Sequence, residues 1–525
     1  MKYIGNNLSS ILCVMLLGAT SCTQDFEDIN TNPNQQIIGS NSGLLLGAQL
    51  SSSSELVDNV RGYNKGLAKW VQYYTTSLSA NEFIPVNPRG DYNDFWIYQN
   101  LIVQSLPAVE RVLDNTANGD QPNYRGAALV MKAWIYENIT ELWGPVPFSD
   151  AQFGEKSEEE RYNKPKLDTQ EEIMKGALII LEEANDTFVL SGNQSIAIEA
   201  ASDAFAGGNI LKWKKFANSL RLRILLRLSD VDPAFAQSGI EAIYNDLDSN
   251  PIMESNNDNF GVNYESPTGS FPDPLARYSL DNGFAPIASS GFVNILGERK
   301  DPRMKVLLAP AVGYKSTETY VGVPPAFDPL NPSGFTRIAR DSVSSLSSMF
   351  VSVNSRNIMN FAEVKFIGAE ASLKGYKVGF SSKSAYDDGI KAHMEEIGNI
   401  DEEQINNFMK QDIIVFKSDT GFEQIITQRY IAQFGQTVNT FSMIRRTGLP
   451  KLDYFKIGAN ADLGYPVRMQ YPETFANFNK ENFDAALQGV DIIGAVFGDK
   501  LWFAQNAPDV KMTDNLQTGP TLFIY

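Results

Sequence analysis

The spacing of apolar residues predicts a mostly helical protein. Across Asn123–Leu142 the apolar side chains recur at intervals of three, four and seven residues, which places them on one face of a helix. A second helix is expected from about residue 168 to Ala184. Asp168 or Thr169 can cap its first turn, where acidic residues follow.

The most distinct helical pattern covers Leu211–Leu228, where one face is apolar. The rest of this helix is strongly basic, through Lys212, Lys214, Lys215, Arg221, Arg223 and Arg227. In an acidic protein such a face is expected to pair with neighbouring acidic helices. A partner-binding surface is the alternative interpretation.

The middle of the chain has a different composition. Residues 251–350 are rich in Pro, Gly, Ser and Asn, and we expect long loops there. Helical patterns return at Phe361–Tyr376, Ala385–Ile397, Glu402–Lys410, Glu423–Phe434 and Phe475–Gln488. Helix pairs with short turns recur without a strict period, so the expected fold is mostly α. Tetratricopeptide-like helix pairs would form a helical scaffold, with long irregular loops on one side.

The first residues have the pattern of an export signal. Lys2 precedes an apolar run over residues 8–19, which is too short to span a bilayer. Small residues stand directly before Cys22, and this arrangement resembles the lipobox of bacterial lipoproteins. The resemblance implies cleavage before Cys22 and attachment of lipid, such as palmitate, to that residue. A plain secretory signal with a stray cysteine is the alternative. The expected parts are a signal peptide at 1–21, a lipidated tether at 22–43 and one body at 44–525.

Charge and rare residues exclude several classes of function. The 525 residues include 44 Lys and Arg against 62 Asp and Glu, a net charge of −18, which disfavours nucleic acid as a partner. The only histidine is His393, expected on an exposed helix face, and the only cysteines are Cys13 and Cys22. A zinc site of several His or Cys residues and a disulfide framework are therefore excluded. Asn256–Asn259 is interpreted as a turn and not as a calcium loop. We predict no catalytic residue, metal site or cofactor.

Several segments, in order along nearly the whole chain, together carry a resemblance to one family. They are Phe26–Asn34, Leu142–Ala151, Trp213–Arg223, Asp301–Arg303, Ala362–Ala371, Gln424–Ala432 with Arg445–Gly448, and Tyr465–Pro472 with Asp499–Phe503. Together they resemble the SusD/RagB family of nutrient-binding outer-membrane lipoproteins, in particular its SusD-like branch. Val467 and Phe503 depart from the family pattern, which often has Arg and Trp at these positions.

The resemblance implies a protein on the outer face of the outer membrane, held there by its lipid. Such a protein acts as a lid on a partner SusC-like TonB-dependent barrel transporter, to which it delivers captured oligosaccharides, and it catalyses no reaction. Three alternatives stay open: a peptide-capturing member of the family, a tetratricopeptide-like scaffold for protein partners, and, with less support, a glycoside hydrolase. A hydrolase would need two carboxylates facing each other in a cleft, for which the sequence has no recognisable motif.

Two segments have the composition of a sugar-binding surface, in which aromatic rings lie beside amide, carboxylate or guanidinium groups. The first contributes Asn81, Arg89, Asp91 and Tyr92, in the region from which the resemblance implies ligand contacts. The second contributes Tyr264, Phe271 and Tyr278, followed by Phe284, as aromatic residues expected on exposed loops. Packing beneath the loops is the alternative for the second set. We predict a non-catalytic glycan or peptide site between the two segments.

Overall fold

The computed structural model describes residues 39–57, 64–75, 99–152, 163–314, 317–323, 339–352, 355–455, 464–491, 494–513 and 522–524. The predicted signal peptide, Cys22 and most of the tether lie outside these residues. So does the whole segment 76–98, which holds Asn81, Arg89, Asp91 and Tyr92.

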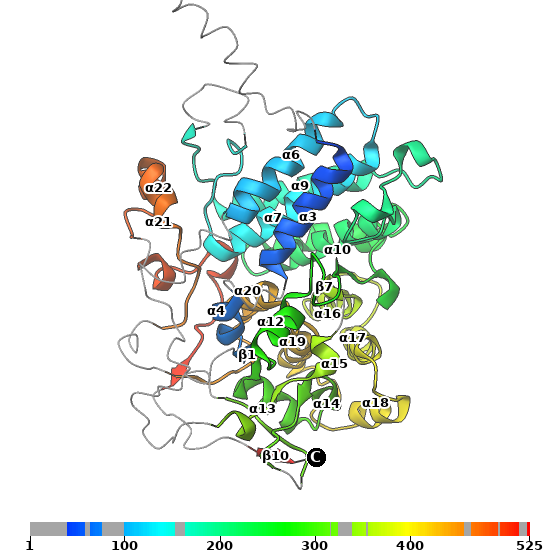
Figure 1. Ribbon diagram of the computed structural model, residues 1–525, viewed down its shortest axis with the longest axis vertical. Helices are drawn as coiled ribbons and strands as arrows, with labels where there is room; N and C mark the ends of the chain where they lie inside the picture. Colours follow the sequence, from blue (N-terminus) through cyan, green and yellow to red (C-terminus); the bar gives the residue numbers. More distant parts are fainter. Residues whose placement is uncertain are drawn as a thin grey trace, which may run out of the picture.

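Helices packed in pairs form the N-terminal half (Figure 1). They are α3 (Asn41–Leu56), α4 (Asn64–Trp70), α6 (Leu106–Asn115), α7 (Pro122–Trp143), α9 (Gln170–Thr187), α10 (Ile210–Leu228) and α11 (Pro233–Asn245), with a π-helix at Gln99–Ser105. Helix α3 packs against α6, α7 against α9, and α10 against both α9 and α11. These pairs confirm the tetratricopeptide-like scaffold expected from the sequence.

The C-terminal half continues the scaffold. Its helices are α12 (Pro274–Asn282), α13 (Ser290–Glu298), α14 (Arg303–Leu307), α15 (Ser348–Val351), α16 (Phe361–Leu373), α17 (Ser382–Ile397), α18 (Glu402–Met409), α19 (Gly421–Ala432), α20 (Thr437–Thr447), α21 (Glu473–Phe478) and α22 (Lys480–Ala486). Helix α16 packs against α17, α19 and α10, and α20 packs against α7, so the two halves share one core.

The strands are short and pair segments that are distant in the sequence. One antiparallel sheet has the order β1 (Tyr74–Thr75), β3 (Ile287–Ala288), β6 (Ser345–Leu346) and β4 (Leu308–Ala309). Strand β2 (Phe260–Asn263) pairs with β7 (Ser355–Met359), and β5 (Thr319–Val321) pairs with β10 (Leu522–Ile524), both antiparallel. Strand β8 (Tyr454–Phe455) runs parallel to β9 (Met512–Thr513).

The helix boundaries follow from capping chemistry. Thr169, and not Asp168, caps α9: its hydroxyl accepts from the backbone N–H of Glu172, whose carboxylate accepts from the backbone N–H of Thr169. Asp168 instead accepts from the backbone N–H groups of Phe148 and Ser149 in the preceding loop. Helix α7 ends at Gly144, whose φ of 96° favours glycine.

The loops expected over residues 251–350 are interrupted by short helices and strands that the sequence did not predict. This region contains α12 and α13, of 9 residues each, together with α14, α15 and strands β2 to β6. Helices of two turns give too little periodicity to be separated from loops by sequence pattern. The expected helix over Phe475–Gln488 is also divided, because α21 ends at Phe478 and α22 begins at Lys480.

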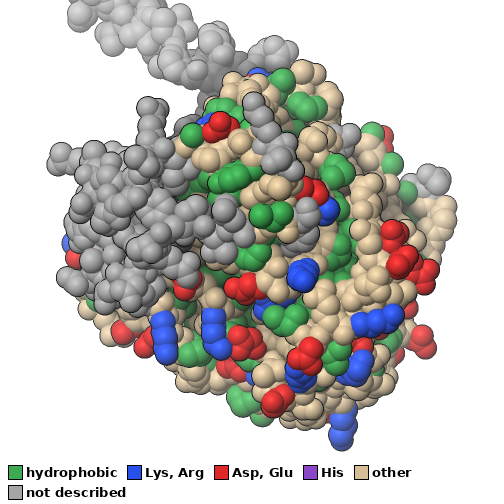
Figure 2. All heavy atoms as spheres, turned by 90° about the horizontal axis from the view of Figure 1, so that it is seen from below, with side chains coloured by type: hydrophobic (Ala, Val, Ile, Leu, Met, Phe, Trp, Pro, Cys, Tyr) green, Lys and Arg blue, Asp and Glu red, His purple; other side chains and the backbone are tan. Residues whose placement is uncertain are grey.

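The molecular surface seen in Figure 2 carries acidic and basic side chains interspersed over the same face. Exposed pairs such as Lys451 with Glu423 (2.9 Å) and Lys305 with Glu318 (2.6 Å) show the same local balance of charge. On this face the net charge of −18 is therefore not gathered into one acidic patch.

Candidate functional site

The aromatic residues expected at the site form two ring pairs around α12. The rings of Tyr264 and Phe271 have centroids 5.0 Å apart, and those of Tyr278 and Phe284 are 6.1 Å apart in an edge-to-face arrangement. The guanidinium carbon of Arg340 lies 3.4 Å from the centroid of Phe284, a cation–π contact. No sequence pattern points to Arg340, because the ring that it contacts is distant along the chain.

Tyr264 and Tyr278 are not exposed loop residues, and this expectation is wrong. Their side chains are 6% and 8% exposed and belong to the hydrophobic core. Asp273 caps α12 by accepting from the backbone N–H of Ala276, and the helix then turns Tyr278 inward. Phe271 and Phe284 pack against the same core but stay half-buried.

The outward face of α12 combines polar and apolar groups. Arg277 pairs with Asp281 one turn later, at 2.9 Å, and the side chain of Leu280 is 54% exposed. Together with the half-buried rings of Phe271 and Phe284, these residues form a surface that we call the α12 face. Flat apolar rings beside charged groups are the chemistry that binds sugars without reacting with them.

The last described strand before the other expected site residues is β1. Tyr74 and Thr75 of β1 lie opposite Ala288 and Ile287 of β3, shortly after α12 ends (Figure 1). Residues 76–98 follow directly and are not described. The positions of Asn81, Arg89, Asp91 and Tyr92 therefore stay a prediction.

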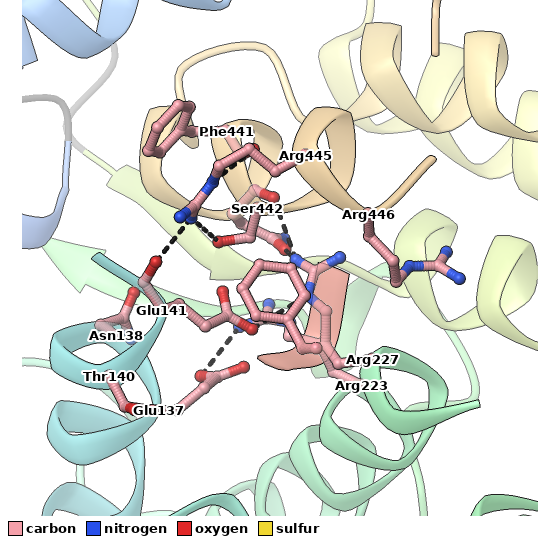
Figure 3. Close-up of polar contacts among 12 residues, drawn as sticks. Glu137, Asn138, Thr140, Glu141, Arg223, Arg227, Phe441, Ser442, Arg445 and Arg446 are labelled. Carbon is pink, nitrogen blue, oxygen red and sulfur yellow. Dashed lines mark hydrogen bonds and ion pairs between the residues drawn. The ribbon is translucent and has the colours of Figure 1, made fainter. Parts of the chain in front are cut away.

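Two carboxylates with strongly shifted pKa values, Glu137 and Glu363, lie in the interior. Figure 3 shows arginines of α10 and α20 meeting glutamates of α7. Arg227 pairs with Glu141 at 3.0 Å. Arg223 reaches Glu137 at 3.6 Å, and also pairs with Glu363 of α16 at 2.9 Å. This confirms that α10 uses its basic residues for ion pairs within the fold.

Burial sets the protonation of this cluster. Desolvation raises the pKa of Glu137 to about 8, in spite of Arg223 beside it. The pKa of Glu363 falls to about 2, because Arg223 and Arg429 outweigh the effect of burial. Both side chains are at most 2% exposed. A carboxyl with a raised pKa can be a general acid, but one sealed among arginines has no room for a substrate.

His393 is buried, and the expectation of an exposed residue is wrong. Its side chain is 3% exposed, with Nδ1 3.2 Å from a guanidinium nitrogen of Arg303. Burial and the charge of Arg303 hold the pKa of His393 well below its usual value, so the imidazole is neutral. Arg303 also pairs with Asp301 at 2.6 Å. The Asp301–Arg303 segment therefore stabilises the fold.

Two searches were negative over the part of the chain that the structure describes. Within those residues, no group of three or more His, Cys, Asp or Glu side chains is placed to hold a metal ion. In the same residues, no helix combines the length and the apolar composition needed to cross a bilayer.

Comparison with known proteins decides the family. A family model described as starch-binding and associating with the outer membrane matches residues 33–472. The chain belongs to this SusD-like family. No protein with a curated description matches the sequence.

Solved structures share the fold of this SusD-like protein. A chitin-binding protein superposes with a TM-score of 0.74 at 23% identity, over 89% of this chain and 100% of that one. A SusD homologue from Bacteroides vulgatus gives a TM-score of 0.73 at 21% identity, over 88% and 97%. A chitin-binding SusD homologue from Flavobacterium johnsoniae gives 0.72 at 19% identity, over 88% and 99%.

Two of the segments that carried the family resemblance pack against each other. The hydroxyl of Tyr471 donates to the carbonyl oxygens of Trp143 and Pro145, at 2.9 and 2.8 Å, and Met469 N–H donates to the carbonyl of Leu142. A Cβ on Gly144 would come within 2.7 Å of Leu501. These segments identify the SusD-like fold because they hold it together, and they do not report the ligand.

Proposed function

We propose that this protein is a cell-surface lipoprotein that captures oligosaccharides and delivers them to a SusC-like TonB-dependent transporter. The observation that carries the proposal is the family match over residues 33–472, described as starch-binding and associating with the outer membrane. Two similar structures are named as chitin-binding, which supports a glycan over other ligands. In this proposal the protein binds its ligand and does not transform it.

The α12 face is the proposed capture surface. Phe271 and Phe284 would contact the apolar faces of sugar rings, with Arg277 and Asp281 at their edges. Arg340 stacks on Phe284 and holds the ring in place. Residues of segment 76–98, with Tyr92 first among them, would complete the site.

Anchoring and delivery form the rest of the proposal. Signal cleavage would leave Cys22 as the first residue of the mature protein, lipidated and inserted in the outer membrane. The transporter would lie beneath the captured glycan. A stable lid of this kind buries a large surface, about 2,000 Å² or more in total.

Calorimetric titration of the mature protein with starch and chitin oligosaccharides tests the capture surface. Phe284→Ala and Tyr92→Ala should each weaken binding roughly fivefold, the loss expected for one aromatic contact. Phe478→Ala is the matched control, because Phe478 is 79% exposed on α21, which lies well apart from α12 (Figure 1).

Tyr278→Ala separates packing from binding. Because Tyr278 is in the core and Phe284 is only half-buried, Tyr278→Ala should lower the melting temperature more than Phe284→Ala does. Undiminished glycan binding by both Phe284→Ala and Tyr92→Ala would contradict the α12 face as the site. Binding of peptides and of no glycan would favour the peptide-capturing alternative.

A further inference from the structure

A second hollow lies beyond the N-terminal end of α12 and is not part of the α12 face. Its volume is about 420 Å³, within the range of small-molecule sites. The carboxylate of Glu396 faces it from the C-terminal turn of α17, and we call it the Glu396 cavity. Met349, which is 46% exposed, stands at its rim, so the cavity opens to solvent.

Asparagine side chains surround the carboxylate of Glu396. The amide of Asn357, on β7, donates to Oε1 of Glu396. Asn259 and Asn360 also lie close enough to lower the pKa of Glu396, and each is fixed by the backbone. The side-chain oxygen of Asn259 accepts from Phe361 N–H at 2.7 Å, and that of Asn360 accepts from Glu363 N–H at 2.9 Å. The carboxylate is therefore rigidly positioned.

Two buried acceptor atoms in this cavity are without a donor. Oε2 of Glu396 and Oδ1 of Asn256 accept no hydrogen bond from any described residue. The orientation of Asn256 is fixed, because its amide donates to the carbonyl of Ala392 at 2.8 Å. Ala392 precedes Glu396 by four residues on α17, so the two acceptors lie on the same side of that helix. Buried acceptors without partners favour a ligand that brings hydrogen-bond donors.

The charges around the cavity favour a neutral ligand, because the carboxylate of Glu396 disfavours an anion and two basic side chains disfavour a cation. Lys212 and Arg356 also line the cavity, and a further positive charge would be repelled by them. Arg356 is held by Asp273, the cap of α12, at 2.7 Å. The rings of Phe350 and Phe434 form an apolar wall, with centroids 4.8 Å apart. A ring that carries several hydroxyl groups and apolar C–H faces can donate hydrogen bonds to the acceptors and pack against this wall.

We propose that the Glu396 cavity is a second binding site, separate from the α12 face. It binds one neutral sugar unit, whose hydroxyl groups donate hydrogen bonds to Glu396 and Asn256. Burial raises the pKa of Glu396 to about 7 against the opposing amides. Near neutral pH its carboxyl therefore exists in both protonation states and matches hydroxyl groups, which can both donate and accept. The proposal does not depend on capture at the α12 face.

Saturation-transfer NMR of the full mature chain tests the site, with glucose, galactose, mannose and N-acetylglucosamine as separate probes. At least one of these sugars should bind. Asn256→Ala and Glu396→Ala should each weaken that binding about tenfold, since each removes an acceptor. Glu395→Gln is the matched control, because Glu395 is the exposed neighbour on α17 and should have no effect.

Further measurements distinguish binding in the Glu396 cavity from binding at the α12 face and from binding of a cation. Phe284→Ala should leave monosaccharide binding intact, whatever happens to oligosaccharides. Ethanolamine, a small ammonium probe, should not displace the sugar. Thermal melts verify folding, and Glu396→Gln replaces Glu396→Ala if the latter is unstable. No binding by any of the four sugars, full binding by the Asn256→Ala variant, or displacement by ethanolamine would each overturn the proposal.

Discussion

Glu137 and Glu363 are buried in the same cluster, yet their protonation shifts in opposite directions. Glu363 meets two arginines and an asparagine, so its charge is compensated. Glu137 has one arginine at 3.6 Å and two glutamates that repel its charge. The basic helix predicted ion pairs of this kind. It could not identify them, because Arg223 and Glu363 are 140 residues apart and meet only in the fold.

The Glu137→Gln variant should become more stable than the wild-type protein as pH rises. The folded pKa of about 8 lies above the usual value of 4.5, so the contribution of Glu137 to wild-type stability is most favourable below pH 4.5 and falls as pH rises toward 8. Glutamine has nearly the same shape and cannot ionise. The variant should gain on the order of 4 kcal/mol relative to wild type between pH 5 and pH 8, at about 1.4 kcal/mol per pH unit. Thermal or urea denaturation across this range measures the difference.

Glu363→Gln should have the opposite effect on stability to that of Glu137→Gln. Removing this charge leaves Arg223 and Arg429 without their shared carboxylate, and should cost roughly 3–5 kcal/mol at pH 7. Because the folded pKa of Glu363 is about 2, its contribution is present above pH 4.5 and is lost as pH falls toward 2. Equal behaviour of the two variants at pH 8 would contradict the assigned protonation states.

At the scale of elements, the apolar pattern located several helices closely and predicted no range for others, among them α3 of 16 residues and α11 of 13. Helices α7, α9, α10, α16, α17, α18 and α19 lie close to the predicted ranges. Their apolar periodicity covers two or more turns and their caps have recognisable side chains. Helices α12 and α13 were missed in a region rich in turn residues. That error also misplaced Tyr278, which α12 turns into the core. Tyr264 directly follows strand β2 and is buried against Phe271.

Thr169→Ala tests the cap of α9. The side chain is exposed, so its loss removes little packing. It removes the hydrogen bond that the hydroxyl accepts from Glu172 N–H and the one that it donates to the Glu172 carboxylate, while the backbone N–H of residue 169 still donates to that carboxylate. We expect a loss of about 1 kcal/mol in the free energy of unfolding. Thr187→Ala is the control at the other end of α9, where the hydroxyl only bonds back to the carbonyl of Glu183, and should change stability by less than about 0.5 kcal/mol. Similar losses in both variants, measured by urea denaturation, would show that the cap is not the cause.

At the scale of the whole molecule, the sequence identifies the fold far better than the binding site. The family segments, such as those of Trp143 and Tyr471, can be recognised in the sequence because each is a short continuous stretch that stabilises the fold. The candidate sites are assembled from distant segments. Arg340 reaches Phe284 only in the fold, and Asn256 bonds to Ala392, 136 residues away. No local pattern could have brought these residues together.

The place of the whole molecule in the cell depends, in our proposal, on Cys22. The small residues before it predict cleavage and lipidation, and more than one attached chain is needed for stable insertion. Cys22→Ala should abolish incorporation of labelled palmitate and move the protein from the outer-membrane fraction to the soluble fraction. Cys13→Ala is the control, since Cys13 belongs to the predicted signal and leaves with it, so anchoring should be unchanged. If the Cys22→Ala protein stays in the outer membrane and still incorporates palmitate, another residue carries the lipid.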